Sequence, residues 1–152
     1  MNILVWPSTP LGPLWGELDS HGKLVAIHWG QSPQNAHPVS NHPAVKALSD
    51  YFTGVKNSVD LECLNLKGTP FQKRVWQALL NIPFGQIKTY GQLAQELNTS
   101  PRALGGAVGA NPVPILVPCH RVMGSNSKLT GFSAPGGIAT KRWLLNHEGH
   151  SL

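Results

Sequence analysis

Cysteine is scarce in this chain, because its 152 residues contain only Cys63 and Cys119. No basic segment with a small-residue cleavage site opens the sequence, so we expect a protein of the cytoplasm, or of the nucleus in a eukaryote, with both thiols reduced. No Cys-x-x-Cys pair occurs, and His37 and His42 stand in a polar stretch without thiol partners, which argues against a zinc site. Cys63 is expected to be a small, buried apolar residue.

Long apolar runs and cofactor fingerprints are missing as well. No segment approaches the roughly 20 apolar residues of a membrane helix, so no membrane association is expected. No glycine-rich fingerprint follows a strand, so we expect no nucleotide cofactor such as S-adenosylmethionine, and no other cofactor. With 41% hydrophobic residues, the chain has enough apolar material for one ordinary domain or for two small lobes.

Acidic residues are rare in the second half of the chain. Residues 67–152 carry nine Lys or Arg against two Asp or Glu, a net charge of +7, whereas residues 1–66 carry three against five, a net charge of −2. This asymmetry predicts a polyanionic partner for the second half, with nucleic acid as the first choice. Ordinary solubility charge is the alternative.

Residues 1–66 are predicted to form an α/β lobe, a small sheet plus a helix. Short apolar runs between Pro and Gly turns predict strands over 3–6, 14–18 and 23–29, followed by a polar loop over 31–40. Asn41 is expected to cap a helix over 42–52 whose buried face carries Val45, Leu48 and Phe52. His28, in the third strand, is expected to be a structural histidine rather than a ligand.

Residues 67–152 are predicted to form a mainly α lobe. Two Ser/Thr-Pro pairs, Thr69-Pro70 and Ser100-Pro101, each combine an N-cap with proline at the first helical position. They predict helices over 70–80 and 101–110, and the pattern adds helices over 90–97 and 138–147. The tight link between the second and third of these helices predicts a helix-turn-helix, within a winged-helix-like lobe.

The helix expected over 101–110 is rich in glycine, with Gly105, Gly106 and Gly109. Each interior glycine costs about 1 kcal/mol relative to alanine, so something must offset the loss. Close packing against a neighbouring helix is one explanation, and a smooth face for the nucleic-acid minor groove is the other. Arg102 lies in the first turn, where it is either a solvent charge or a side chain that fills the gap left by an extruded base.

Pro118-Cys119-His120-Arg121-Val122 places a thiol beside an imidazole, directly after a proline-punctuated apolar run over 111–117. A thiolate is a strong nucleophile, and a nearby base can generate it. The prolines restrict the loop. The pattern indicates a group-transfer site built on a stiff support.

These motifs resemble those of the O6-alkylguanine-DNA alkyltransferases, the methylated-DNA–protein-cysteine methyltransferases. The resemblance covers nearly all of residues 69–149, and the first half of the chain matches only in outline. Besides the cysteine motif and its preceding loop, it is carried by Phe84-Gly85, Thr89-Tyr90-Gly91-Gln92-Leu93-Ala94, Arg102-Ala103-Leu104-Gly105-Gly106-Ala107, Thr130-Gly131-Phe132, Gly136-Gly137 and Trp143-Leu144-Leu145-Asn146-His147-Glu148-Gly149.

The resemblance implies single-turnover repair, in which O6-alkylguanine, and O4-methylthymine as well, is flipped out of duplex DNA and dealkylated. Cys119 would accept the alkyl group, His120 would draw its proton through a water, and Glu148 would hold the imidazole. Asn111 would brace the loop, and Tyr90 would donate a hydrogen bond to the base. DNA and base contacts would come from Arg102 as the finger, with Ala103, Gly105, Gly106, Val122, Ser133 and Lys141.

A monomer acting on double-stranded DNA from the minor groove is expected. The segment over 132–137 is about two residues longer than in some members of the family, which bears on Ser133. Three other classes of protein compete with this interpretation. An alkyltransferase-like protein would lack Cys119, a helix-turn-helix regulator would need no Cys-His pair, and a Cys-His hydrolase would need an oxyanion hole, for which no local signature occurs.

Overall fold

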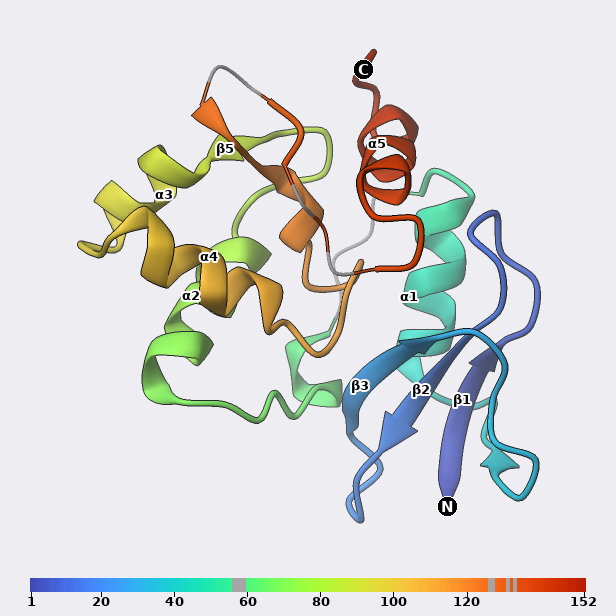
Figure 1. Cartoon of the computed structure of the whole chain (residues 1–152). Helices are drawn as coiled ribbons and strands as arrows, with labels where there is room; N and C mark the ends of the chain where they lie inside the picture. The colour runs from blue at the N-terminus through green and yellow to red at the C-terminus, as the bar shows by residue number, and fades with distance from the viewer. Residues whose placement is uncertain (56–59, 126–127, 131, 133) are drawn as a thin grey trace. The chain divides into compact units, whose positions relative to one another are not determined.

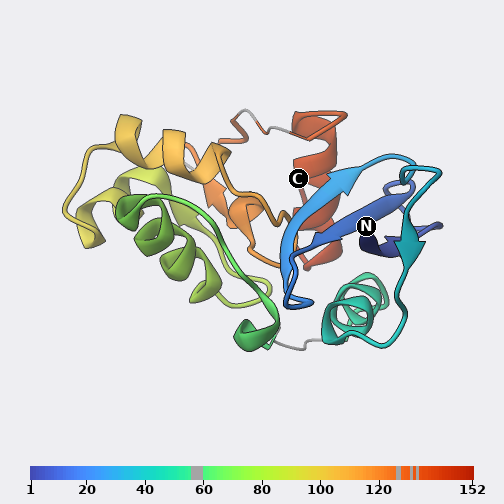
Figure 2. The same ribbon diagram turned by 90° about the horizontal axis from the view of Figure 1, so that it is seen from below.

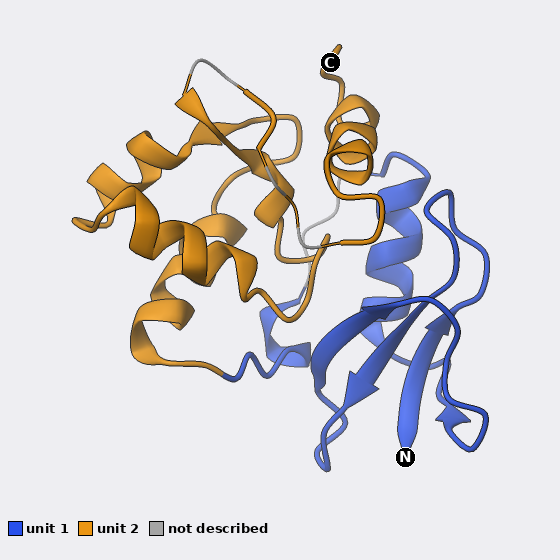
Figure 3. Cartoon of the chain, in the orientation of Figure 1, with its two compact units in different colours: residues 1–67 blue, residues 68–152 orange. Residues whose placement is uncertain are grey.

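The computed structural model describes residues 1–55, 60–125, 128–130, 132 and 134–152. The chain divides into two compact units, residues 1–67 and residues 68–152 (Figure 3). The first contains a small sheet and a helix, and the second is mainly helical. This confirms the fold class predicted from the sequence. Within the described ranges, every helix is too short or too polar to cross a membrane.

The sheet of the first unit has the order β3-β2-β1-β4 (Figure 1). Strands β1 (Asn2–Trp6), β2 (Leu14–Leu18) and β3 (Leu24–Trp29) form an antiparallel meander. The two-residue strand β4 (His37–Pro38) lies inside the segment predicted as a loop, and it pairs parallel to β1. Two residues are too few to produce an alternating pattern, so this strand has no sequence signal.

Helix α1 (Pro43–Phe52) packs against β1, and the Trp6 indole donates to the Val45 carbonyl over 3.2 Å. The predicted cap, Asn41, is wrong, because His42 caps this helix. Its Nδ1 accepts from Ala44 N at 3.1 Å while its Nε2 lies 2.9 Å from the Gly22 carbonyl. One neutral tautomer satisfies both contacts, which gives His42 an advantage over a shorter side chain.

The buried face of α1 also differs from the predicted one. Leu48 is buried as expected, but Ala44 and Tyr51 flank it in the core, whereas Val45 and Phe52 are only half-buried. Residues 44, 48 and 51 are spaced by four and three, and residues 45, 48 and 52 by three and four; both fit one helix face, so periodicity alone does not choose between them.

Two predictions about single residues of the first unit are confirmed. Cys63, at the end of the 3-10 turn η1 (Leu61–Cys63), is buried. His28 stacks on the Trp15 ring at 4.3 Å between centroids, and its Nε2 lies 3.2 Å from the Glu17 carboxylate. These neighbours give His28 a structural role on the sheet.

The second unit contains α2 (Pro70–Leu80), α3 (Tyr90–Glu96), α4 (Pro101–Gly109) and α5 (Ile138–His147). Thr69, Thr89 and Ser100 cap the first three of these helices through their hydroxyl groups. Asn98 adopts a left-handed conformation between α3 and α4, with φ 54°. Asparagine tolerates this conformation better than most residues, so the link can stay short and the helix-turn-helix forms.

Short elements complete the second unit. Strand β5 (Lys88–Thr89) pairs parallel to β6 (Val122–Met123), and the 3-10 turn η2 (Cys119–Arg121) directly precedes β6. The pairing of β5 with β6 joins the start of α3 to the segment that carries the cysteine motif.

Trp76 anchors the glycine-rich helix α4 to α2, two helices that lie side by side in Figure 2. Its indole nitrogen donates to the Ala107 carbonyl over 2.9 Å, in a fully buried contact. Ala107 lies in the last turn of α4, where carbonyls lack intrahelical partners, so the indole satisfies a group that the helix leaves open. Gly68 allows the chain to pass close to this ring, because a Cβ there would lie 2.6 Å from it.

Candidate active site

Cys119 follows a loop, residues 111–118, that its own hydrogen bonds hold in shape. The Asn111 side chain donates to the Val117 carbonyl over 2.8 Å and accepts from Val113 N over 3.0 Å. Between these contacts, Ile115 is buried and adopts φ 74°, an unusual backbone conformation for a β-branched residue. Such a residue costs about 1–3 kcal/mol, so the surrounding contacts must impose the conformation.

Cys119 lies at the start of η2, and only 7% of it is exposed. Burial raises the pKa of its thiol, while a hydrogen bond from Asn111 and the charge of Lys141 act in the opposite direction. The net shift is upward, so the resting group is a thiol. A thiolate at this place needs a proton acceptor and a nearby positive charge.

Lys141 supplies such a charge from α5. Its side chain is 1% exposed, its ammonium donates to the Val122 carbonyl over 2.6 Å, and it lies 5.9 Å from the centre of the Tyr90 ring. Burial lowers the pKa of Lys141, whereas the neighbouring Cys119 raises it. Tyr90 opens α3, and burial raises the pKa of its phenol. Lys141 therefore contacts both Val122 and Tyr90, interacts with Cys119, and is not a surface side chain.

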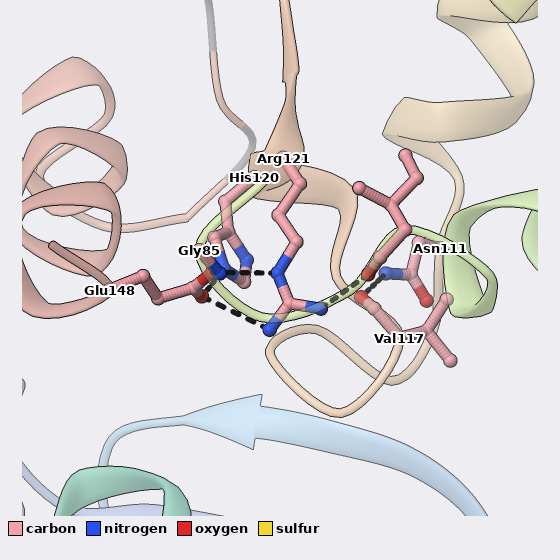
Figure 4. A network of polar contacts seen from close by, with 7 residues as sticks. Gly85, Asn111, Val117, His120, Arg121 and Glu148 are labelled. Carbon is pink, nitrogen blue, oxygen red and sulfur yellow. Dashed lines mark hydrogen bonds and ion pairs between the residues drawn. The ribbon is translucent and has the colours of Figure 1, made fainter. Parts of the chain in front are cut away.

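His120 and Glu148 form the buried pair expected for a proton relay. Their side chains are fully buried, and His120 Nε2 lies 2.5 Å from Glu148 Oε2 (Figure 4). Burial would raise the pKa of Glu148, but the hydrogen bonds and charges of His120 and Arg121 outweigh it and lower that pKa to about 2. Burial lowers the pKa of His120 despite the attraction of Glu148. The pair thus consists of a carboxylate and a neutral imidazole.

Two members of this network, Arg121 and Gly85, were not among the predicted site residues. The Arg121 guanidinium donates to both oxygens of Glu148, from Nε over 2.7 Å and from its second terminal nitrogen over 3.2 Å (Figure 4). It also donates to the Ile82 carbonyl over 2.7 Å, and Gly85 N donates to Glu148 Oε1 over 3.1 Å. The signal for Arg121 was present in the sequence, because a cation amid an apolar motif must be paired if it is buried.

The predicted DNA-contacting residues of α4 form a separate, exposed group. Arg102, Ala103 and Gly106 line an open groove together with residues at the start of α2 and the cap of α4, namely Thr69, Phe71, Gln72 and Ser100. A Cβ added at Gly105 or at Gly106 would meet nothing within 4 Å. Close packing therefore does not explain these two glycines.

The structure thus brings together Cys119, His120, Glu148, Asn111, Tyr90, Val122 and Lys141, and it places Arg102, Ala103, Gly105 and Gly106 on the outer face of α4. Ser133 lies outside the described residues. Among the described residues, no group of three or more His, Cys, Asp or Glu side chains is arranged to hold a metal ion.

Known proteins match this chain in both sequence and structure. Residues 70–150 match the family described as 6-O-methylguanine DNA methyltransferase, DNA binding domain. The chain is 44% identical to the methylated-DNA–protein-cysteine methyltransferase of Salmonella typhimurium, over 95% of this chain and 94% of that protein.

Solved structures are similar over nearly the whole chain. Mycobacterium tuberculosis OGT in complex with DNA superposes with a TM-score of 0.82 and 39% identity, covering 97% of this chain and 92% of that one. The O6-methylguanine-DNA methyltransferase of Pyrococcus kodakaraensis strain KOD1 gives a TM-score of 0.71 and 27% identity, covering 98% of this chain and 99% of that one.

Proposed function

Because the chain belongs to the O6-methylguanine DNA methyltransferase family, we propose that it repairs alkylated DNA by taking the alkyl group onto its own Cys119. It is a methylated-DNA–protein-cysteine methyltransferase that acts once per molecule. One observation supports the assignment of this activity to particular side chains. The buried Cys119 thiol is adjacent in sequence to the neutral imidazole of His120, which contacts the Glu148 carboxylate. The charge of the buried Lys141 ammonium also acts on this thiol.

The first step generates the thiolate. The proton of Cys119 passes, through one water, to the ring nitrogen of His120 that does not face Glu148, and the carboxylate then stabilises the imidazolium. The Lys141 ammonium stabilises the charge on sulfur, in agreement with the mutual attraction of these two groups. Asn111 holds the loop through the Val117 carbonyl and favours the thiolate form of Cys119, so the nucleophile keeps a fixed position.

The second step transfers the alkyl group. A new bond forms between sulfur and the alkyl carbon, the bond from that carbon to guanine O6 breaks, and its electron pair remains on the base. The Tyr90 hydroxyl donates a hydrogen bond to the ring as this charge develops, and its raised pKa keeps it protonated. The thioether product is not hydrolysed, so no step restores the thiol and no cofactor is needed.

The exposed face of α4 presents the lesion to this site. The base lies inside the duplex until it is flipped out, which costs a few kcal/mol. Arg102 projects from the first turn of α4 and takes the place of the extruded nucleotide, while Ala103, Gly105 and Gly106 let the helix approach the minor groove closely. The protein acts as a monomer on double-stranded DNA, in the compartment that holds the DNA, and Val122 and Ser133 complete the contacts with the base.

Mass spectrometry tests this function directly. After incubation with a duplex that carries O6-methylguanine, the peptide containing Cys119 should gain one methyl group, and Cys119→Ser should gain none. The second cysteine, Cys63, is an internal control, because it is buried in the other unit. A methyl group on Cys63, or tight binding without any transfer, would refute the assignment, and the second result would indicate a binding-only protein.

A further inference from the structure

Arg121 is the buried charge for which the proposed chemistry has no role. Its side chain is buried, and its guanidinium makes hydrogen bonds to Glu148 (Figure 4) and to the Ile82 carbonyl. The bidentate arrangement on a carboxylate is the strong form of an Arg–Glu pair. Arg121 itself lies at the end of η2, two residues after the nucleophile.

Glu148 is consequently shared between two partners. His120 Nε2 and Arg121 both contact Oε2, while Arg121 Nε and Gly85 N donate to Oε1. The carboxylate therefore has donors on both oxygens, and its single negative charge is balanced by the guanidinium before His120 is considered. Lys141 of α5 is a further charged group that acts on His120, and Cys119 is its neighbour in the sequence.

The formal charges of the buried cluster decide the protonation state of His120. With Arg121 present, the cluster of Glu148, Arg121 and His120 is neutral when the imidazole is neutral. Without Arg121, the same cluster is neutral only when the imidazole carries a proton. Because an uncompensated buried charge is costly, the arginine determines which of these two states is favoured.

We propose that Arg121 is a positioning residue that keeps His120 a neutral proton acceptor by neutralising Glu148. Without this guanidinium, His120 would be an imidazolium paired with the Glu148 carboxylate, and it could not accept a proton from Cys119. The inference rests on the proposed function for its consequence, since only alkyl transfer makes the basicity of His120 matter. The protonation of His120 itself is measurable without any substrate.

Two substitutions on opposite sides of the Arg121–Glu148 contact separate this role from a merely structural one. Arg121→Met removes the positive charge, and Glu148→Gln removes the negative one. Charge balance predicts that the pKa of His120 rises in Arg121→Met and falls in Glu148→Gln, by about one to three pH units each. Loss of local structure predicts a change in the same direction for both variants, towards the value of an exposed histidine.

The experiment is a pH titration of the histidine rings by heteronuclear NMR, with His120 assigned from the resonance that is lost in His120→Gln. The rate of alkyl transfer from free O6-benzylguanine is measured over the same pH range. Arg121→Met should lose at least tenfold in rate at neutral pH and recover part of it as the pH rises, and Arg121→Lys should restore part of the neutral rate. A rate lowered by one factor at every pH, with an unmoved His120 titration, would overturn the proposal.

The double variant covers the case in which Arg121→Met does not fold. Arg121→Met combined with Glu148→Gln leaves neither charge unpaired, and its His120 should titrate at higher pH than in Glu148→Gln alone. An equal pKa in these two proteins would also overturn the proposal. If the wild-type protein fails to transfer an alkyl group, the proposed function fails, whereas the opposite pKa shifts still test the role of Arg121.

Discussion

Alanine at a glycine of α4 whose Cβ would meet open space should stabilise the protein and weaken its binding to DNA. Gly105 and Gly106 lie within the helix, and a Cβ at either position would point into open space. Since glycine in a helix interior costs about 1 kcal/mol relative to alanine, Gly106→Ala should gain about that much stability. For a chain of this length, 1 kcal/mol corresponds to a rise of about 2–4 °C in Tm.

The same methyl group would stand on the face of α4 that we propose approaches the DNA. The minor groove is about 6 Å wide, so a helix face that approaches it tolerates little added volume. We expect Gly106→Ala to weaken binding to a duplex with O6-methylguanine by about tenfold, or about 1.4 kcal/mol. Reaction with free O6-benzylguanine is the control, and it should be unchanged because Cys119 and its network are untouched.

Thermal unfolding and fluorescence anisotropy with a labelled duplex would measure the two effects. Opposite signs, a higher Tm with weaker duplex binding, are the expected result. If Gly106→Ala binds the duplex as tightly as the wild type, this face of α4 does not meet DNA. If the substitution instead lowers Tm, Gly106 has a packing role.

Three further substitutions or conditions test other parts of the molecule. Arg102→Ala should slow repair of the duplex far more than reaction with free O6-benzylguanine, and an equal loss on both substrates would exclude the finger role. Trp76→Phe should lower the free energy of unfolding in urea by about 1–3 kcal/mol, because the Ala107 carbonyl loses its buried donor; an unchanged transition midpoint would contradict this. Acidification should destabilise the fold in two phases. The first begins below about pH 6.5, because the pKa of His120 is lowered in the folded state and the unfolded chain binds the proton more readily. The second runs from about pH 4.5 towards pH 2, as Glu148 loses its charge. In Glu148→Gln the second phase, followed by circular dichroism, should be smaller, and an identical acid transition would remove Glu148 from this account.

Helix boundaries were predictable where a nearby side chain caps the helix. Thr69 and Ser100, each followed by proline, cap α2 and α4 at the expected positions, because the cap acts within a few residues of itself. His42 was missed because its capping role depends on the Gly22 carbonyl, which is distant in sequence. The short strands β4, β5 and β6 were not predicted, because pairing with another strand determines their conformation and two residues alone carry no pattern.

The residues of the candidate site were likewise predictable where the signal is local in the sequence, and not where it depends on distant partners. Cys119 and His120 are adjacent in the sequence, so their chemistry could be inferred from the residues themselves, while Glu148 and Asn111 were assigned only through the resemblance. Lys141 was assigned a DNA or base contact, yet it is buried beside the cysteine, since its position on α5 faces η2. Arg121 was overlooked, because its partners Glu148 and Ile82 lie 27 and 39 residues away.

The burial of Cys119 has a consequence for the lifetime of the protein before it meets a lesion. Oxidants and small electrophiles in the cell attack exposed thiolates, and oxidation beyond the sulfenic acid is largely irreversible. With 7% exposure and a raised pKa, the resting sulfur is shielded from such reagents in two ways. A protein that uses one acceptor cysteine once loses its whole repair capacity if that sulfur is oxidised first. The burial that raises the pKa of the thiol therefore also protects it from oxidation until it meets a flipped base.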